Sequence, residues 1–270
     1  QSDLSFTSGY SPYALDFDSA SSDYIDCGND SSLNVSTSNH SFSFWLKTTT
    51  TSNEVIAQKG NGDELDTQTR PIGSGNVAIS WAGFNGYDGT TVINDGNWHN
   101  IIFIANGSVS YIYVDGNLDV TGGNKIQSSS NSDSFYIGSR AGLYGFNGSL
   151  SNLSIWNTAL TSAQVTELYS EGVPSNLNNH SAYSNLISWW QLGSNSSFNT
   201  NWTVLDEKGS NNGTSVNMDE VDIVDGVNTY GGGTSSGMGG DEVIGDAPYS
   251  SSNSLSVNMD VLDRVTDTPS

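Results

Sequence analysis

A run of short, turn-separated strand patterns between Ala14 and Gly172 constrains the fold more than any other feature of this sequence. Apolar and polar residues alternate along Ser41–Leu46 and again along Ser108–Val114, which is the pattern of half-buried strands. Ile101–Ala105 is apolar throughout and suits a strand at the centre of a sheet. Such strands, joined by loops rich in Gly and Asn, predict an all-β fold.

One segment, Thr161–Glu171, is predicted to be a helix, and it follows the last of these strands. Thr161 and Gln164 have the spacing of a capping box, in which each side chain bonds a free backbone N–H at the helix start. Gly172 and Pro174 are placed to end the helix.

Seven strand-like segments follow one another in a fixed order, namely Ala14–Asp18, Asp23–Gly28, Phe42–Lys47, Gly96–Phe103, Ser110–Asn117, Phe135–Gly138 and Phe146–Trp156. In this order and at these spacings they resemble the laminin-G-like and pentraxin-like branch of the concanavalin A-like lectin/glucanase superfamily. The resemblance implies a jelly-roll β-sandwich with one short helix. Proteins with this fold usually bind ligands or have structural roles, and fewer are enzymes.

A further strand pattern, residues 185–193, lies behind the jelly roll, whereas relatives commonly carry such a segment in front of it. We expect it to complete the sandwich as a late-supplied strand, in its own chain or in a neighbour. A simple edge strand is the alternative. The expected organisation is therefore a laminin-G-like jelly-roll domain over residues 1–194 and an extended acidic tail over residues 195–270.

The tail contains short repeats built on Asn-Met-Asp. Asn212–Asp219 and Asn253–Asp260 match at an offset of 41 residues, and a weaker copy lies at Gly237–Val243. Repeats this short cannot bury a core of their own, so we expect them to dock on another surface or subunit. A disordered low-complexity tail is the alternative. The expected assembly residues are Met218, Val224, Met238, Val243, Met259 and Val265.

The formal net charge of −22, with only seven Lys and Arg, argues against nucleic acid as a partner. No apolar run approaches the roughly 20 residues that span a bilayer, so no membrane insertion is expected. No signal peptide is visible, but the chain starts at Gln1, so either a leader was removed or the numbering begins after one. Cys27 has no disulfide partner and is expected to be a small buried apolar residue.

The acidity has two readings: solubility in salty surroundings, or calcium sites. The family resemblance implies one Ca²⁺ at the rim of the sandwich. The matching positions here are Asp16, Asp18, Asp23 and Asn147. Ser151 and Asn152 stand where relatives often carry an acid, and solvated loop acids are the alternative.

Two acidic segments come near the Glu-x-Asp-x-x-Glu pattern of laminarinase-type glycoside hydrolases, whose nucleophile and acid lie about 5 Å apart. Glu64–Thr69 lacks the final carboxylate, and Glu220–Asp225 ends in Asp and lies inside a repeat. His40, His99 and His180 are the only histidines and do not indicate a catalytic triad. We therefore expect no enzymatic activity.

Aromatic residues in Gly- and Asn-rich loops could stack on sugar rings. The candidates are Trp81, Phe84, Tyr87 and Tyr144, and packing in the core or in turns is the alternative for each.

A lectin-like domain with a repeat tail resembles virion structural proteins of marine bacteriophages. The leading hypothesis is a non-catalytic protein of a virion surface (capsid decoration, head fibre or tail fibre), tied to other subunits or to itself by its tail. It would hold cell-surface glycans through many weak contacts. The alternatives are a secreted bacterial carbohydrate-binding module or adhesin and, less favoured, a laminarinase-type hydrolase.

Overall fold

The computed structural model describes residues 12–59, 64–81, 86–127 and 129–227, which belong to one compact unit ending at Val227. The aromatic candidate Phe84 and the expected anchors Met238, Val243, Met259 and Val265 lie outside the described residues.

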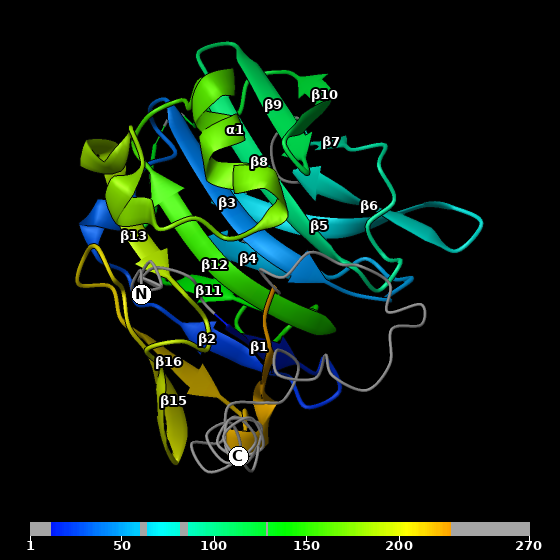
Figure 1. Cartoon of the computed structure of the whole chain (residues 1–270), viewed down its shortest axis with the longest axis vertical. Coiled ribbons are helices and arrows are strands. Elements are labelled where there is room, and N and C mark those ends of the chain that lie inside the picture. The colour runs from blue at the N-terminus through cyan, green and yellow to red at the C-terminus, as the bar shows by residue number, and fades with distance from the viewer. Residues whose placement is uncertain (1–11, 60–63, 82–85, 128, 228–270) are drawn as a thin grey trace, which may run out of the picture. The chain divides into compact units, whose positions relative to one another are not determined.

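Two antiparallel sheets form the described unit (Figure 1). Sheet A has the order β10-β9-β8-β3-β12-β1-β17, with β13 also paired to β12, and sheet B has the order β14-β15-β16-β2-β11-β4-β5-β6-β7. This arrangement and the single α-helix of the described residues confirm the predicted all-β jelly-roll sandwich.

The strands of sheet A are β1 (Tyr13–Phe17), β3 (His40–Lys47), β8 (Trp98–Asn106), β9 (Val109–Val114), β10 (Asn117–Gly122), β12 (Gly148–Trp156), β13 (Leu186–Trp190) and β17 (Ile223–Asp225). The strands of sheet B are β2 (Tyr24–Asp26), β4 (Val55–Lys59), β5 (Glu64–Gly73), β6 (Asn76–Trp81), β7 (Tyr87–Asp88), β11 (Phe135–Ile137), β14 (Ser197–Asn199), β15 (Asn201–Val204) and β16 (Gly213–Val216). The helices are α1 (Ser162–Tyr169) and the 3₁₀ turns η1 (Ser31–Leu33), η2 (Ser170–Gly172), η3 (Leu177–Asn179), η4 (Tyr183–Asn185) and η5 (Glu220–Asp222).

The core between the sheets follows from strand alternation. Phe42 and Phe44 point from β3 into this core, where they pack against each other and against Phe103 of β8. Cys27 is buried in the same core, as the sequence predicts. The outward residues of sheet B are mostly polar, and this difference between the two faces of one sheet positions the candidate site.

The outer face of sheet A is covered by the helical segments that follow β12. Val165 and Leu168 of α1 pack with Ile102, Ile104 and Trp156 of the sheet, and Figure 1 shows α1 lying across it. A second apolar cluster therefore buries both faces of these central strands.

Helix α1 begins at the predicted place and ends earlier than predicted. Thr161 accepts the backbone N–H of Gln164, whose side chain bonds back, so the capping box is present. The helix ends at Tyr169, because the next residue, Ser170, adopts a left-handed conformation (φ 46°).

Strand β13 pairs antiparallel with β12 of the same chain, beside the stretch of β12 that pairs with β1. The residues after β13 form strands, whereas an extended tail was expected from residue 195. Strands β14 to β16 extend sheet B from β2, and β17 pairs with β1 at the edge of sheet A. The described unit therefore continues to Val227 instead of ending at residue 194.

The buried Asp206 explains why this late segment folds onto the sandwich. Its carboxylate accepts backbone N–H groups of Trp189, Lys208, Gly209 and Asn211 at 2.9–3.1 Å, which ties the loop before β16 to β13. Compositional reading of the tail missed this, because an acidic, Gly-rich stretch also resembles a solvated linker.

Two expected assembly residues are part of the same unit. Met218 is 2% exposed and packs in the core between the sheets. Val224 lies on β17 and pairs with Ala14 of β1. The expectation that Met218 docks on another surface is wrong for the described structure, because its own sandwich supplies the apolar contact. Val224 is held in the same sandwich by backbone pairing.

Candidate functional site

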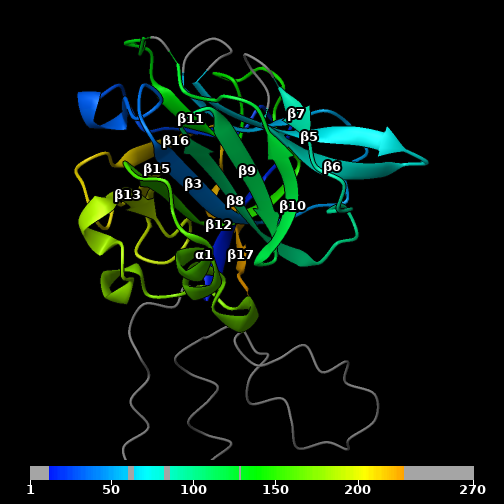
Figure 2. The same ribbon diagram turned by 90° about the horizontal axis from the view of Figure 1, so that it is seen from above.

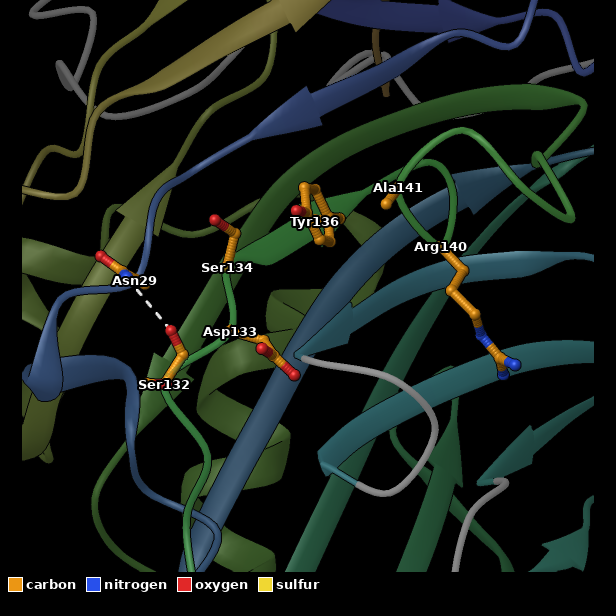
Figure 3. Close-up of a pocket in the computed structure, with 7 residues that line it drawn as sticks. All are labelled: Asn29, Ser132, Asp133, Ser134, Tyr136, Arg140 and Ala141. Atoms are coloured by element: carbon orange, nitrogen blue, oxygen red, sulfur yellow. Dashed lines mark hydrogen bonds between the residues drawn. The ribbon is translucent and has the colours of Figure 1, made fainter.

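A polar groove of about 410 Å³ lies on the outer side of sheet B, around β11. Figure 3 shows its side chains in a row that runs from Asn29 to Arg140, with Tyr136 between them. It is lined by Asn29, Ser132, Asp133, Ser134, Tyr136, Arg140 and Ala141.

Tyr136 reaches the groove because of strand alternation. Phe135 and Ile137 on either side of it point into the core and are fully buried, so Tyr136 faces outward. Its ring meets the ring of Tyr24 edge to face, with centroids 5.8 Å apart. This contact fixes one side of the phenol and leaves Tyr136 half-exposed in the groove.

Arg140 is held by two neighbouring strands of sheet B. Its Nε donates to Gln58 Oε1 at 2.7 Å, and its guanidinium lies 3.5 Å from a carboxylate oxygen of Asp66. Asp66 is itself buried and accepts from Gln68 Nε2 at 2.9 Å. These contacts orient the guanidinium at one end of the groove.

A free donor lies beneath this network. Gln58 is fully buried, yet its Nε2 has no hydrogen-bond partner among the described residues. A buried polar atom without a partner is costly and rare in folded proteins. A water molecule or a ligand hydroxyl would satisfy this donor.

The other end of the groove is formed by the chain that leads into β11. Asn29 Nδ2 donates to the carbonyl of Ser132 at 3.1 Å, and Lys59 Nζ donates to the carbonyl of Asp133 at 2.7 Å. The groove therefore has a carboxylate, a guanidinium and several hydroxyl and amide groups, which is a set of partners suited to sugar hydroxyls.

A tight turn beside the groove displays two large side chains. Arg140 and Leu143 exchange backbone hydrogen bonds of 2.8 and 2.9 Å across Ala141 and Gly142, both of which have positive φ. Leu143 and Tyr144 are 62% and 63% exposed. The Arg140 guanidinium lies 5.4 Å from the centre of the Tyr144 ring, so this ring stands next to the groove.

Of the three aromatic candidates that the structure describes, Tyr144 alone is largely exposed. Trp81 is 2% exposed and packs edge to face on Phe103, so it is a core residue and the prediction for it is wrong. Tyr87 is half-buried and packs against the same core. Sequence reasoning missed Tyr136, although its alternation with two apolar neighbours was a usable signal.

The expected calcium ligands have other partners. Asp16 accepts from Ser149 Oγ at 2.7 Å, and Asp18 accepts from the backbone of Ala20 at 2.8 Å. Asn147 uses its backbone, accepting from Thr48 and donating to Glu54. Among the described residues, no three or more His, Cys, Asp or Glu side chains are placed to hold a metal ion.

Asp23 alone keeps a feature that suits a cation. It is 3% exposed, and its Oδ1 has no hydrogen-bond partner among the described residues. Burial, with repulsion from Asp222, Asp18 and Asp219, raises its pKa to about 6. The residues thus offer one orphaned carboxylate oxygen in an acidic setting, but no assembled coordination sphere.

The acids of the two segments that come near the hydrolase pattern are arranged differently from a catalytic pair. Asp66 uses its two carboxylate oxygens toward Gln68 and Arg140. The second segment, Glu220–Asp225, forms η5 and β17 instead of a single strand face.

Comparison with known proteins supports the fold. The profile of the concanavalin A-like lectin/glucanases superfamily matches residues 18–166, and no curated protein sequence matches significantly. A candidate carbohydrate binding protein from Bacteroides ovatus has a TM-score of 0.62 at 17% identity. The match covers 80% of this chain and 60% of that protein, so this chain spans less than two thirds of it.

Two further solved structures are less similar. The heptameric SAP-like pentraxin from Limulus polyphemus has a TM-score of 0.48 at 14% identity, over 76% of this chain and 95% of its own. Domain 4 of an extracellular GH43 arabinanase from Geobacillus stearothermophilus, in complex with arabinotriose, has a TM-score of 0.40 at 26% identity, over 50% and 68% of the two chains. Separately, none of the helices in the described part is long and apolar enough to cross a membrane.

Proposed function

We propose, since this chain belongs to the concanavalin A-like lectin/glucanases superfamily, that it is a non-catalytic glycan-binding protein whose site is the groove on sheet B. The observation that carries this is the outward Tyr136 set between a fixed guanidinium and a row of hydroxyl and amide groups. An aromatic ring with polar groups around it matches a sugar, which has apolar ring faces and hydroxyl edges.

The experiment that tests the site is glycan binding by the full chain, on an array and then by titration calorimetry. Tyr136→Ala should weaken binding by at least roughly fivefold, because an aromatic contact contributes about 1 kcal/mol beyond its buried area. Tyr113→Ala, on sheet A, is the matched control and should bind as the wild type does. Equal binding by both variants would show that the sugar lies elsewhere.

Absence of catalysis is part of the same proposal. The structural support is the engagement of Asp66 by Gln68 and Arg140, which leaves this acid poorly placed as a nucleophile. Release of reducing sugar from a β-glucan incubated with the full chain would contradict it.

We place this activity at the surface of a virion, as a capsid decoration, head fibre or tail fibre. The motivating features are the repeated Asn-Met-Asp units and the strongly acidic chain. A secreted bacterial adhesin or carbohydrate-binding module is the alternative. Mass spectrometry of purified phage particles and of culture supernatant distinguishes the two, because only a structural protein stays with washed particles.

Anchoring by the C-terminal repeats completes the proposal. The first repeat is used within its own sandwich, so the later repeats are the candidates for contact with other subunits or with a second copy of this chain. The solution mass of the full chain, measured by light scattering, tests this. A defined oligomer supports anchoring between copies, whereas a monomer contradicts contact between copies and leaves a different subunit as the partner.

Calcium binding is a separate proposal, motivated by the orphaned oxygen of Asp23. Asp23 would supply this oxygen and Asp18 a second carboxylate, after a change in the hydrogen bonds that Asp18 now makes. Calorimetric titration of the full chain with Ca²⁺ should give one site that Asp23→Asn removes and Asp119→Asn leaves unchanged.

A further inference from the structure

The charge of Arg140 is compensated inside the protein. Its guanidinium lies 3.5 Å from a carboxylate oxygen of Asp66, which is 2% exposed, and its Nε donates to Gln58 at 2.7 Å. Figure 3 shows the Arg140 side chain extending away from Tyr136. A ligand anion that drew the guanidinium to itself would deprive a buried carboxylate of its cation, which is costly. Arg140 is therefore poorly placed to neutralise a charged ligand, although its other N–H groups can donate to hydroxyl oxygens.

The strand register places a carboxylate and an amide on the two sides of Tyr136. Tyr136 lies opposite Asp26 of β2 and opposite Gln58 of β4. Directly opposed residues of antiparallel strands point to the same face, with Cβ atoms about 4.5–5.5 Å apart. One carboxylate oxygen of Asp26 accepts the backbone N–H of Gly28 at 2.8 Å, which holds the carboxylate in place. A sugar ring stacked on Tyr136 would therefore come close to the Asp26 carboxylate.

A second carboxylate belongs to the groove itself. Asp133 lines the groove and is exposed. Its backbone is held on both sides, because its N–H donates to Asn131 Oδ1 at 2.9 Å and its carbonyl accepts from Lys59 Nζ at 2.7 Å. An ionised carboxylate only accepts hydrogen bonds, so it pairs with a hydroxyl and has nothing to donate to an anion. Asp26 and Asp133 thus suit hydroxyl groups and repel negative ones.

The acids near Tyr136 and Arg140 outnumber the bases. The acids are Asp26, Asp66 and Asp133, and the bases are Arg140 and Lys59. The chain as a whole has a formal charge of −22. At physiological salt, exposed charges more than about 8 Å apart are largely screened, so the groups in the groove decide most of what a bound ligand experiences.

The unpaired donor beside Tyr136 is neutral. Gln58 Nε2 has no hydrogen-bond partner among the described residues, and the amide carries no charge. An amide donor needs only an oxygen acceptor, which a hydroxyl or a ring oxygen of a sugar supplies. A hydroxyl both donates and accepts, so it matches an amide donor on one side of Tyr136 and a carboxylate acceptor on the other.

We propose that the groove binds neutral glycans, whose polar groups are hydroxyls, in preference to glycans that carry carboxylate or sulfate groups. This inference rests on the proposed function and names the class of glycan that the site takes. Asp26 and Asp133 accept from glycan hydroxyls, and Arg140 stays with Asp66. Asp26 and Asp66 are then specificity-determining residues, although neither lines the groove.

Binding of matched oligosaccharides to the full chain tests the preference. The probes are oligosaccharides of cellulose, galactan and mannan, each used as such and after oxidation of its primary hydroxyls to carboxylates. In a pair that binds, the neutral member should bind at least roughly fivefold more tightly, because the charged member meets Asp26 and Asp133 and competes with Asp66 for Arg140. Tyr136→Ala should weaken binding of the neutral member, which assigns the binding to this groove.

Variants of three carboxylates locate the cause of the preference. Asp66→Asn releases the charge of Arg140 and should reduce the preference at least roughly fivefold. Asp133→Asn changes an exposed carboxylate and should reduce the preference in the same direction, so the test does not depend on the folding of a buried variant. Asp88→Asn is the matched control, because Asp88 forms an exposed pair with Arg70 at 3.7 Å on the same sheet. It should leave the preference unchanged.

The same titrations at high salt separate the groove from the charge of the whole chain, since salt screens distant charges more than contacts. A preference that survives salt and falls in Asp66→Asn but not in Asp88→Asn supports the inference. A preference that disappears at high salt, or falls equally in both variants, overturns it. Binding of the oxidised member as tightly as the neutral one, with the same loss in Tyr136→Ala, overturns the inference and supports the proposed function. Binding that never depends on Tyr136 contradicts both.

Discussion

The outer face of sheet A is apolar and covered, whereas the outer face of sheet B is polar. On sheet A, Trp156 and Ile104 are buried under α1 and the turns that follow it. On sheet B, Tyr136 and Arg140 face a groove, where Tyr136 packs against Tyr24 and Arg140 donates to the buried side chain of Gln58. Figure 2 shows the helical segments gathered on the side of sheet A. The comparison teaches that one face stabilises the fold, while the other presents oriented polar groups.

The largest loss of stability is expected when the buried Trp156 of sheet A is removed. Trp156→Ala should cost about 3–5 kcal/mol of unfolding free energy, because a fully buried indole packed against His180 is replaced by a cavity. Urea denaturation of both proteins measures this. At temperatures where the variant is folded, glycan binding should match that of the wild type, and a loss of binding there would mean that the two faces are coupled.

A second test removes Arg140, a residue of the groove on sheet B. Arg140→Ala should cost roughly 1–3 kcal/mol, because Asp66 is buried and loses a charged partner. It should also weaken glycan binding more than Trp156→Ala does. The control is Arg70→Ala, since Arg70 and Asp88 form an exposed pair at 3.7 Å that should contribute less than about 0.5 kcal/mol.

A third test measures how the stability that His99 contributes at the rim of sheet A depends on pH. His99 lies between Asp115, at 2.8 Å, and Asp95, at 3.2 Å, and the hydrogen bond to Asp115 is the main cause that raises its pKa. A raised pKa stabilises the fold fully below the ordinary value for histidine, and this stabilisation is lost as the pH rises through the raised value.

His99→Gln should therefore cost about 1 kcal/mol at pH 6 and less at pH 9. Unfolding free energies of both proteins at the two pH values check this. A difference that does not change with pH would show that His99 contributes only packing. Glycan binding should not follow this transition, because the described groove lining contains no histidine.

The smallest stability effect is expected at the turn beside the groove. Tyr144→Ala should change the unfolding free energy by less than about 0.5 kcal/mol, since the ring is 63% exposed. If the ring stacks on sugar, glycan affinity should still fall severalfold. Leu143→Ala, at the adjacent exposed position, is the control, and equal affinity losses in both would indicate a general disturbance of the turn.

Local patterns predicted the strands and failed at the site for a physical reason. The alternation in Phe42–Lys47 and the capping box at Thr161 act over a few residues, so they can be read directly. Trp81 and Tyr144 both stand in Gly-rich sequence, yet one is buried and the other exposed. Which of two aromatic residues reaches solvent depends on what packs over it, and that comes from distant segments.

The sequence by itself determined the all-β class, the α1 start and the repeats, because periodicity, capping and self-similarity are local properties of the chain. Only the tertiary structure decided that β14 to β17 belong to the sheets, that Met218 is a core residue, and that Tyr136 and Arg140 share a groove. The reason is that burial depends on contacts between segments far apart in the chain. An acidic, Gly-rich segment can form either a solvated tether or a strand of the sheet, and its composition does not distinguish the two.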